Sequence, residues 1–372
     1  MAAPDPPARP AISRDVLEQA VRHFAGAGAA LVSARPLAGD RGGTELKQAG
    51  YGEPLLLRYR TPEGEQEAVF RTMMPNWFGH DRRADRASLA ILAADTYGQM
   101  PRHVRVLDVG ALGGPSGVIS LSGAGEIYLV TTYAPGALYA GDLAAIEARG
   151  SATPLDMARQ HALCQYLVEL HAAPHTTASR APEVYTRAIR DLLGSGEGIF
   201  GIVDSYPPGG PVPPERLARI EGRCLAWRHR LRGRERRLRR THGDYHPYNI
   251  LFREGVDLTV LDASRGGAGE PADDLVAMAM NYFFRGVLTP ASWALGMKPL
   301  WTAFWQTYLS ATNDEEVLSV AAPFLAWRAL VLASPVWYPS VTPDARDAIL
   351  RFAEAALDAP SFDPESASRF VG

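Results

Sequence analysis

The sequence predicts an α+β fold in two lobes, a small N-terminal lobe with an antiparallel sheet and a larger, mostly helical C-terminal lobe. Short apolar runs separated by turn residues fill residues 30–133, a pattern typical of antiparallel strands. From Pro154 onward, the apolar residues recur with the spacing of amphipathic helices. The length of 372 residues also exceeds what one hydrophobic core usually organises, which favours two lobes.

The composition is that of an ordinary globular chain and excludes several functional classes. A hydrophobic share of 47% and a charged share of 21% argue against wholesale disorder. The net charge of −3 leaves no large positive surplus for binding nucleic acid. Two cysteines, Cys164 and Cys224, cannot build a disulfide framework or a four-thiolate zinc site. With no apolar export signal or membrane span, we expect a cytoplasmic protein with no nucleic-acid or membrane partner.

The N-terminal lobe is expected over residues 11–133, after a disordered tail at 1–10 that holds four prolines. Ser13 can cap a helix that reaches about Ala25. One more helix is predicted at 81–97, inserted into the sheet. The predicted strands lie at 31–37, 55–59, 68–73, 104–109, 118–121 and 127–132.

The C-terminal lobe is expected over residues 134–372. Pro154 fits the first position of a helix, with Thr153 as its N-cap. Four apolar residues of this helix repeat at i, i+3, i+4 and i+7: Leu163, Tyr166, Leu167 and Leu170. A stretch rich in proline and glycine at 207–214 then breaks the helical pattern, and a helix from Pro214 to Arg239 follows.

Four features of the C-terminal lobe permit more than one interpretation. The apolar stretch 321–339 is interrupted by Arg328 and Pro335, which indicates a buried helix and a turn. Residues 228–240 contain eight arginines, either a solvated helix face or a site for an anionic ligand. Five of the seven tryptophans lie in the last 80 residues, where they form helix–helix core or an aromatic wall for a substrate. The acids at 314–316 are interpreted either as a site that attracts a polyamine or as acids that stabilise the N-terminus of a helix.

The segment that carries chemistry begins with Thr-His-Gly-Asp-Tyr-His-Pro-Tyr-Asn at 241–249. Two apolar runs, 250–252 and 258–261, follow this polar loop and predict a β-hairpin. The hairpin would bring Asn249, at the start of one strand, close to Asp262, at the end of the other. One amide and one carboxylate oxygen suit a hard cation that also binds phosphate oxygens, such as Mg²⁺ with ATP. Asp244 would stand beside the cation and orient the proton of an attacking hydroxyl.

A zinc cluster is the competing interpretation of His242, Asp244 and His246, because alternating histidine and aspartate can ligate zinc. Hydrolytic zinc sites need further ligands at defined spacing, and the other histidines form no paired motif. The joint occurrence of Asn249 and Asp262 with the acids that follow favours the magnesium interpretation.

The motif His242-Gly-Asp-x-His-x-x-Asn249, followed by Leu261-Asp262, resembles the aminoglycoside phosphotransferase and choline kinase family. Gly269-Glu-Pro-Ala-Asp-Asp274-Leu and the helix end Leu167-Val-Glu-Leu-His171-Ala resemble two further segments of that family. The likeness covers roughly residues 30–280. It implies a protein-kinase-like bilobal fold and, as cofactors, ATP and Mg²⁺.

The resemblance assigns roles to individual residues of the C-terminal lobe. Asp244 would be the catalytic base, and Asn249 and Asp262 the magnesium ligands. Structural support of the site is expected from His242, His246 and Asp274. Asp274 would also cap the helix that follows it. The catalytic loop with its flanks would span 241–275, and the later helices would bind the acceptor.

In the N-terminal lobe, the resemblance implies a sheet that clamps the nucleotide. Arg71 stands where the third-strand cation should be, with Asp85 as its helix partner. Thr132 and Tyr133 lie at the strand end that resembles the adenine-binding hinge. The glycines at 39, 42 and 43 would cover the phosphates, or form a plain flexible loop.

The resemblance therefore implies a cytoplasmic kinase that transfers the γ-phosphate of ATP to a hydroxyl of a small molecule. An aminoglycoside-like compound, a sugar or an amino alcohol is the expected acceptor, and the chain is expected as a monomer or homodimer. A nucleotide-binding pseudokinase or partner scaffold is the first alternative. A protein kinase is the second, and we disfavour it because no long activation segment separates Asp262 from Asp274.

Overall fold

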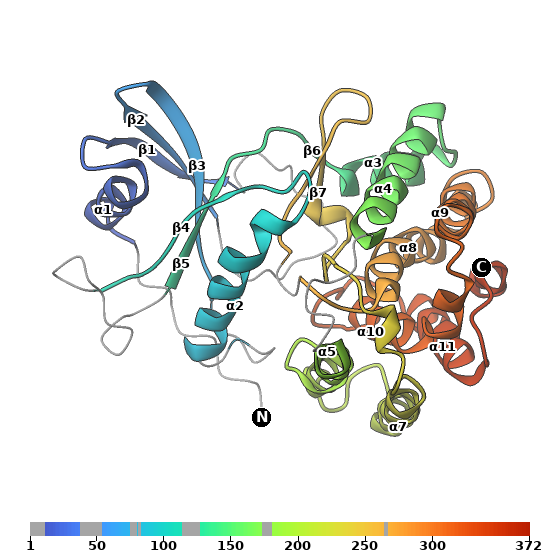
Figure 1. The fold of residues 1–372 in the computed structure, drawn as a ribbon. Helices are drawn as coiled ribbons and strands as arrows, with labels where there is room; N and C mark the ends of the chain where they lie inside the picture. The colour runs from blue at the N-terminus through green and yellow to red at the C-terminus, as the bar shows by residue number, and fades with distance from the viewer. Residues whose placement is uncertain are drawn as a thin grey trace. The chain divides into compact units, whose positions relative to one another are not determined.

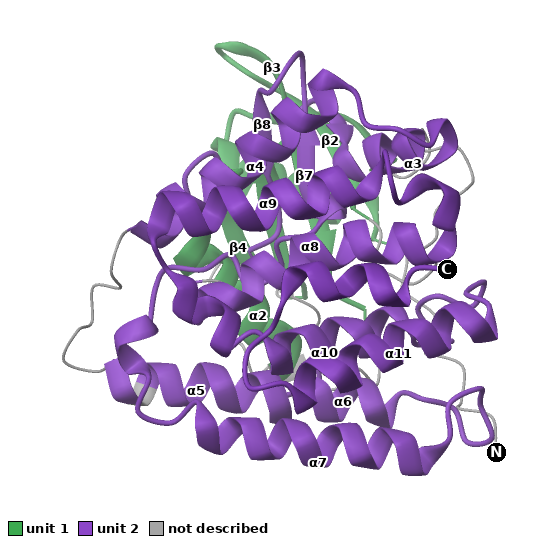
Figure 2. Cartoon of the chain, turned by 90° about the vertical axis from the view of Figure 1, so that its right-hand side faces the viewer, with its two compact units in different colours: residues 1–99, 103–134 green, residues 100–102, 135–372 purple. Residues whose placement is uncertain are grey.

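The computed structural model describes residues 12–37, 54–74, 80, 83–113, 127–172, 181–263 and 267–372. The predicted tail at 1–10, the glycines at 39, 42 and 43, and the predicted strand at 118–121 lie outside these ranges. The chain divides into two compact units (Figure 2). The first comprises residues 1–99 and 103–134, and the second comprises residues 100–102 and 135–372.

The first unit is built on a five-stranded antiparallel sheet with the order β1-β2-β3-β5-β4 (Figure 1). The strands are β1 (Ala30–Pro36), β2 (Leu55–Thr61), β3 (Gly64–Thr72), β4 (Val106–Ala111) and β5 (Ile127–Thr132). The β2–β3 pair is a tight hairpin in which Thr61 pairs with Gly64. The mixture of an antiparallel sheet and helices confirms the predicted fold class.

Two helices accompany this sheet, α1 (Arg14–Ala25) and α2 (Arg83–Thr96). Helix α1 begins at the predicted cap, since the Ser13 hydroxyl accepts a hydrogen bond from the Val16 N–H at 3.4 Å. Its apolar face shares one buried core with the sheet. The fully buried members of that core are Val21, Leu57, Ala68, Phe70 and Val130.

The second unit is mostly helical and carries one small sheet, in the order β6-β7-β8. The strands are β6 (Ala137–Leu138), β7 (Ile250–Phe252) and β8 (Leu258–Val260). The helices are α3 (Tyr139–Arg149), α4 (Pro154–Ala172), α5 (Ala181–Gly194), α6 (Ile199–Asp204), α7 (Pro214–Arg230), α8 (Pro271–Leu288), α9 (Met297–Thr312), α10 (Ala322–Leu332) and α11 (Pro343–Asp358).

Helix α8 is the centre of the second unit and packs against α9, α10 and α11. Most of its residues are buried, because neighbouring helices cover it on several sides. The tryptophans of the last 80 residues join this core, and each of them is at most 7% exposed. Phe283 on α8 lies 4.3 Å from Phe352 on α11 between ring centroids. The core interpretation of the aromatic residues is therefore confirmed.

The helix predicted from Pro214 to Arg239 was wrong at its end, because α7 ends at Arg230. Gly233 adopts a φ of 80°, a left-handed conformation that cannot continue a right-handed helix. Glu235–Arg237 then form a separate 3₁₀ turn. The solvated helix face predicted for the arginines at 228–240 consequently does not exist beyond Arg230.

The predicted buried helix in the stretch 321–339 is confirmed as α10. Among the described residues, none of the helices is both long enough and apolar enough to span a bilayer.

We expect Phe283→Ala to lower the free energy of unfolding by about 4 kcal/mol, because it removes a ring that is fully buried between helices. The measurement is urea unfolding followed by circular dichroism. Leu295→Ala is the control, since this side chain is 70% exposed and its loss should cost less than about 0.5 kcal/mol. Equal effects of the two substitutions would contradict this account of the core.

Candidate active site

The loop at 241–249 connects to the β7–β8 hairpin in a way that brings two distant residues together. Ile250 pairs with Val260, and the Leu261 N–H donates to the Asn249 carbonyl at 2.8 Å. Asp262 follows Leu261 directly, so its backbone lies close to that of Asn249. The predicted hairpin thus places residues 249 and 262 next to each other at the backbone level.

Asn249 is oriented by the residues of its own loop. Its amide nitrogen donates to the Asp244 carbonyl at 3.0 Å and lies 3.5 Å from Asp244 Oδ2. The amide oxygen must therefore point away from Asp244, as assigned from this hydrogen-bond pattern. An amide oxygen in that position can serve as a ligand for a hard cation.

Asp262 adopts a φ of 56°, which is uncommon for a residue other than glycine. Aspartate tolerates this left-handed conformation better than most residues do. Such a conformation costs free energy and is often found at functional sites. It makes the chain turn immediately after β8, at the point where the hairpin meets the loop.

His242 is buried, and both of its ring nitrogens are used within the loop. Nδ1 accepts from the Asp244 N–H at 3.2 Å, and Nε2 lies 2.8 Å from the Leu261 carbonyl oxygen. Burial lowers the pKa of His242, which favours a neutral ring that donates through Nε2. Neither nitrogen is left for zinc, and the described residues include no group of three or more histidines, cysteines or acids suited to a metal. The structure thus disfavours the zinc interpretation.

Asp274 is fully buried on α8 and holds the start of the loop at 241–249. Its Oδ2 accepts from the His242 N–H and its Oδ1 from the Gly243 N–H, both at 2.8 Å. His171 Nε2 lies 3.1 Å from Oδ2, and His171 Nδ1 lies 2.8 Å from the Tyr308 hydroxyl. Burial alone would raise the pKa of Asp274, but the hydrogen bonds and the neighbouring histidines lower it below its usual range.

The backbone of Gly243 and the N-cap of α8 both bear on how Asp274 meets the loop. Gly243 has a φ of 81°, a conformation that glycine adopts without the steric cost of a side chain. The predicted role of Asp274 as a helix cap is wrong, because α8 begins at Pro271 and Glu270 is its N-cap. Asp274 instead lies within the first turn and points both carboxylate oxygens at the loop.

The roles of two residues of this site, Tyr245 and Arg328, were not predicted from the sequence. Tyr245 stacks on Tyr166 of α4 at 5.5 Å between ring centroids, and its hydroxyl donates to the Leu163 carbonyl at 3.1 Å. Arg328 of α10 donates from Nη1 to Asp244 Oδ1 at 2.7 Å. The signal for Arg328 was present in the sequence, since a lone arginine in an apolar helix requires a carboxylate partner.

The family model described as the phosphotransferase enzyme family matches residues 57–296 of this chain. The match covers more than half of the chain and includes the loop at 241–249 and the β7–β8 hairpin. The chain belongs to this family. Its members transfer phosphate to small molecules and use ATP with a divalent metal. The resemblance to aminoglycoside phosphotransferases and choline kinases is therefore confirmed.

The chain is similar to several solved structures. An amicoumacin kinase, solved with AMP-PNP, Ca²⁺ and Ami, is 14% identical with a TM-score of 0.52, and the match covers 86% of this chain and 90% of that one. The choline kinase LicA from Streptococcus pneumoniae is 12% identical with a TM-score of 0.46, over 92% and 98% of the two chains. The macrolide 2'-phosphotransferase MphH from Brachybacterium faecium is 16% identical with a TM-score of 0.44, over 94% and 99%. A search of curated protein sequences found no match.

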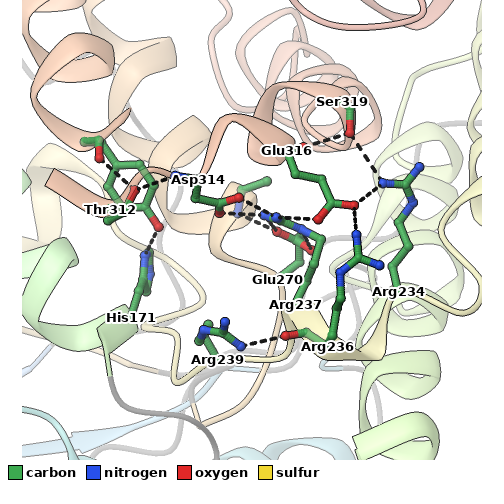
Figure 3. Close-up of polar contacts among 12 residues, drawn as sticks. His171, Arg234, Arg236, Arg237, Arg239, Glu270, Thr312, Asp314, Glu316 and Ser319 are labelled. Atoms are coloured by element: carbon green, nitrogen blue, oxygen red, sulfur yellow. Dashed lines mark hydrogen bonds and ion pairs between the residues drawn. The ribbon is translucent and has the colours of Figure 1, made fainter. Parts of the chain in front are cut away.

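The arginine-rich run of this phosphotransferase forms an ion-pair network (Figure 3). Arg237 is 5% exposed and bonds Glu270 at 2.7 Å and Asp314 at 2.6 Å. Arg234 and Arg236 both donate to Glu316 Oε1 at 2.6 Å. The acids at 314 and 316 are thus engaged by arginines, which weakens the idea that they attract a polyamine.

The residues expected to bind the nucleotide lie in the first unit. Arg71 is in β3, opposite Leu129, and Asp85 is in the first turn of α2. Thr132 ends β5, where its hydroxyl accepts from the Arg105 N–H at 3.1 Å, and the half-exposed Tyr133 follows. The nucleotide-binding roles of these residues, and the pairing of Arg71 with Asp85, stay predictions.

We expect Asp274→Asn to lower the free energy of unfolding at pH 7 by about 2 kcal/mol, because the amide group turns a donor toward one of two backbone N–H groups. Urea unfolding measures the loss. Asp358→Asn is the control, since its side chain is 61% exposed and its removal should change little.

The effect of Asp274→Asn should also depend on pH. The folded-state pKa of Asp274 is lower than the unfolded value of about 3.9, so the wild-type advantage is fully present above about pH 4. It is lost as the pH falls through the lowered pKa. The difference in unfolding free energy between wild type and variant should therefore stay constant from pH 7 to about pH 4 and shrink at lower pH. A difference that shrinks between pH 7 and pH 5 would contradict the assignment.

Proposed function

We propose that this phosphotransferase moves the γ-phosphate of ATP to a hydroxyl group of a small molecule. The observation that supports this most directly is the arrangement around Asn249. Its side chain contacts Asp244, and its backbone is hydrogen-bonded to the residue before Asp262. The proposed base and both proposed oxygen ligands thus belong to one loop and its hairpin.

Asn249 and Asp262 would hold the magnesium ion. Their amide and carboxylate oxygens are the hard ligands that this ion prefers, and two protein ligands leave room for water and phosphate oxygens. The orientation of the Asn249 amide, with its nitrogen toward Asp244, fits this role. When bound, Mg²⁺ would stabilise the negative charge on the phosphate oxygens.

Asp244 would align the acceptor hydroxyl and receive its proton. A carboxylate offers about four lone-pair sites, so Asp244 can accept from Arg328 and from the acceptor hydroxyl at the same time. His242 and Asp274 keep the loop backbone in place through the bonds described above, and Tyr245 attaches it to α4. Most of the rate acceleration would then come from positioning and electrostatics.

The acceptor is a small molecule in this proposal rather than a protein. Only residues 263–273 lie between Asp262 and Asp274, which leaves no room for a long activation segment. We expect a panel of aminoglycosides, macrolides, choline, amino alcohols and sugars to contain an acceptor that raises ADP release above the ATP-only rate. Nucleotide binding without phosphorylation of any compound would instead favour the pseudokinase alternative, and labelling of protein substrates would favour a protein kinase.

Asp244→Ala should reduce phosphoryl transfer at least about 10³-fold while the affinity for Mg-ADP changes less than about twofold. The reason is that Asp244 acts on the acceptor hydroxyl and not on the nucleotide. Steady-state ADP release and fluorescence titration with a labelled nucleotide measure the two quantities. A matching loss of nucleotide affinity would contradict the role of Asp244 as base.

Asp262→Ala should weaken Mg-ADP binding at least about tenfold, because it removes the charged ligand of the cation. Nucleotide titration in the presence and absence of Mg²⁺ separates this effect from general damage. Asp257→Ala is the matched control on the same hairpin, since this exposed carboxylate pairs with Arg253 and faces solvent. Equal nucleotide affinity of both variants would exclude Asp262 as a ligand.

A further inference from the structure

Arg328 is a buried cation that contacts the proposed catalytic base. The residue is 8% exposed on α10, and its Nη1 lies 2.7 Å from Asp244 Oδ1. On the other side of the carboxylate, His246 Nε2 lies 3.3 Å from Asp244 Oδ2. The two oxygens of Asp244 are therefore held by groups from α10 and from the catalytic loop.

Arg328 is poorly compensated for a buried ion. Among the described residues, its buried Nε and Nη2 have no hydrogen-bond partner, and the ion pair of Nη2 with Asp273 Oδ1, at 3.6 Å, is too long for a hydrogen bond. Arg237, in contrast, makes four hydrogen bonds to Glu270 and Asp314, at 2.6 to 3.0 Å. A buried guanidinium with one short bond contributes little net stability, because desolvation offsets the attraction. Stability alone therefore does not explain why Arg328 occupies this position.

The loop at 241–249 contains no lysine or arginine that could hold Asp244 in the same way. The charge that orients Asp244 comes from a helix 84 positions later in the chain. The guanidinium itself is fixed, because its Cζ lies 3.8 Å from the ring centroid of Trp327.

We propose that Arg328 is a positioning residue for phosphoryl transfer, holding Asp244 Oδ1 so that the carboxylate presents a constant face to the acceptor hydroxyl. This inference rests on the proposed function of Asp244. A free aspartate side chain samples several rotamers, and fixing it before the reaction removes that entropic cost from the barrier. Arg328 would accordingly influence the rate of transfer and leave nucleotide binding unchanged.

The test uses the slow hydrolysis of ATP by water, because it needs no identified acceptor. Arg328→Met should lower kcat for ADP release about 100-fold, with KM for ATP within about twofold of wild type. Arg328→Lys should recover part of kcat, since an ammonium can reach one carboxylate oxygen but lacks the planar fork. Arg216→Met is the control. That partly buried arginine makes three carboxylate bonds between α7 and α11, so its loss should lower Tm and leave kcat within about twofold.

A double substitution separates positioning from a general structural role. If Arg328 acts through Asp244, then Asp244→Ala and Asp244→Ala/Arg328→Met should share the same residual kcat. A further loss in the double variant, comparable to that of Arg328→Met alone, would overturn the inference. Wild-type kcat in Arg328→Met would overturn it as well. Should Arg328→Met fail to fold, Arg328→Lys carries the test, with an expected loss of about tenfold in kcat at unchanged KM.

The outcomes also distinguish this inference from the proposed function. Hydrolysis by the wild type that is lost in Asp244→Ala but retained in Arg328→Met would overturn the role of Arg328 alone. No phosphoryl transfer by the wild type, to water or to any compound of the panel, would overturn the proposed function and this inference together.

Discussion

The site depends on one buried carboxylate, that of Asp274. A charged group at 0% exposure is unfavourable unless several donors surround it, and here two backbone N–H groups and one histidine do so. Because both N–H groups belong to the residues just before Asp244, the same bonds that make the buried charge tolerable also fix the loop. The hydrogen bonds that stabilise the buried carboxylate of Asp274 thus also determine the position of Asp244, the proposed base.

Three buried or partly buried arginines of the second unit each connect two or more elements. Arg237 connects the turn after α7 to α8 and to the segment after α9. Arg216 joins α7 to α11, and Arg328 joins α10 to the catalytic loop. The first two have several carboxylate bonds each, which is what a structural ion pair requires. Arg328 has one short bond, and that bond reaches the residue on which the proposed chemistry depends.

The catalytic loop was the most predictable part of the molecule, because its residues are close in sequence. The order of Asp244, Asn249 and Asp262 with one hairpin between them constrains the backbone strongly, and the observed pairing of Ile250 with Val260 agrees with it. The end of α7 was predicted less well, because the helical spacing continues past Gly233 while the backbone does not. The cap of α8 was also mispredicted, because Glu270 and Asp274 are both acids near the helix start. Only the structure shows which of them faces the backbone N–H groups of the helix.

The sequence by itself determined the α+β class, the helices and strands with strong periodicity, the family, and the segment that carries the chemistry. These features depend on residues near one another in the chain, where spacing and turn chemistry act directly. The tertiary structure alone decided that Arg328 pairs with Asp244, that Tyr245 stacks on Tyr166, and that the arginines near 237 meet the acids at 314 and 316. Each of these contacts joins residues more than 75 positions apart, and their meeting depends on how whole helices pack rather than on any local pattern.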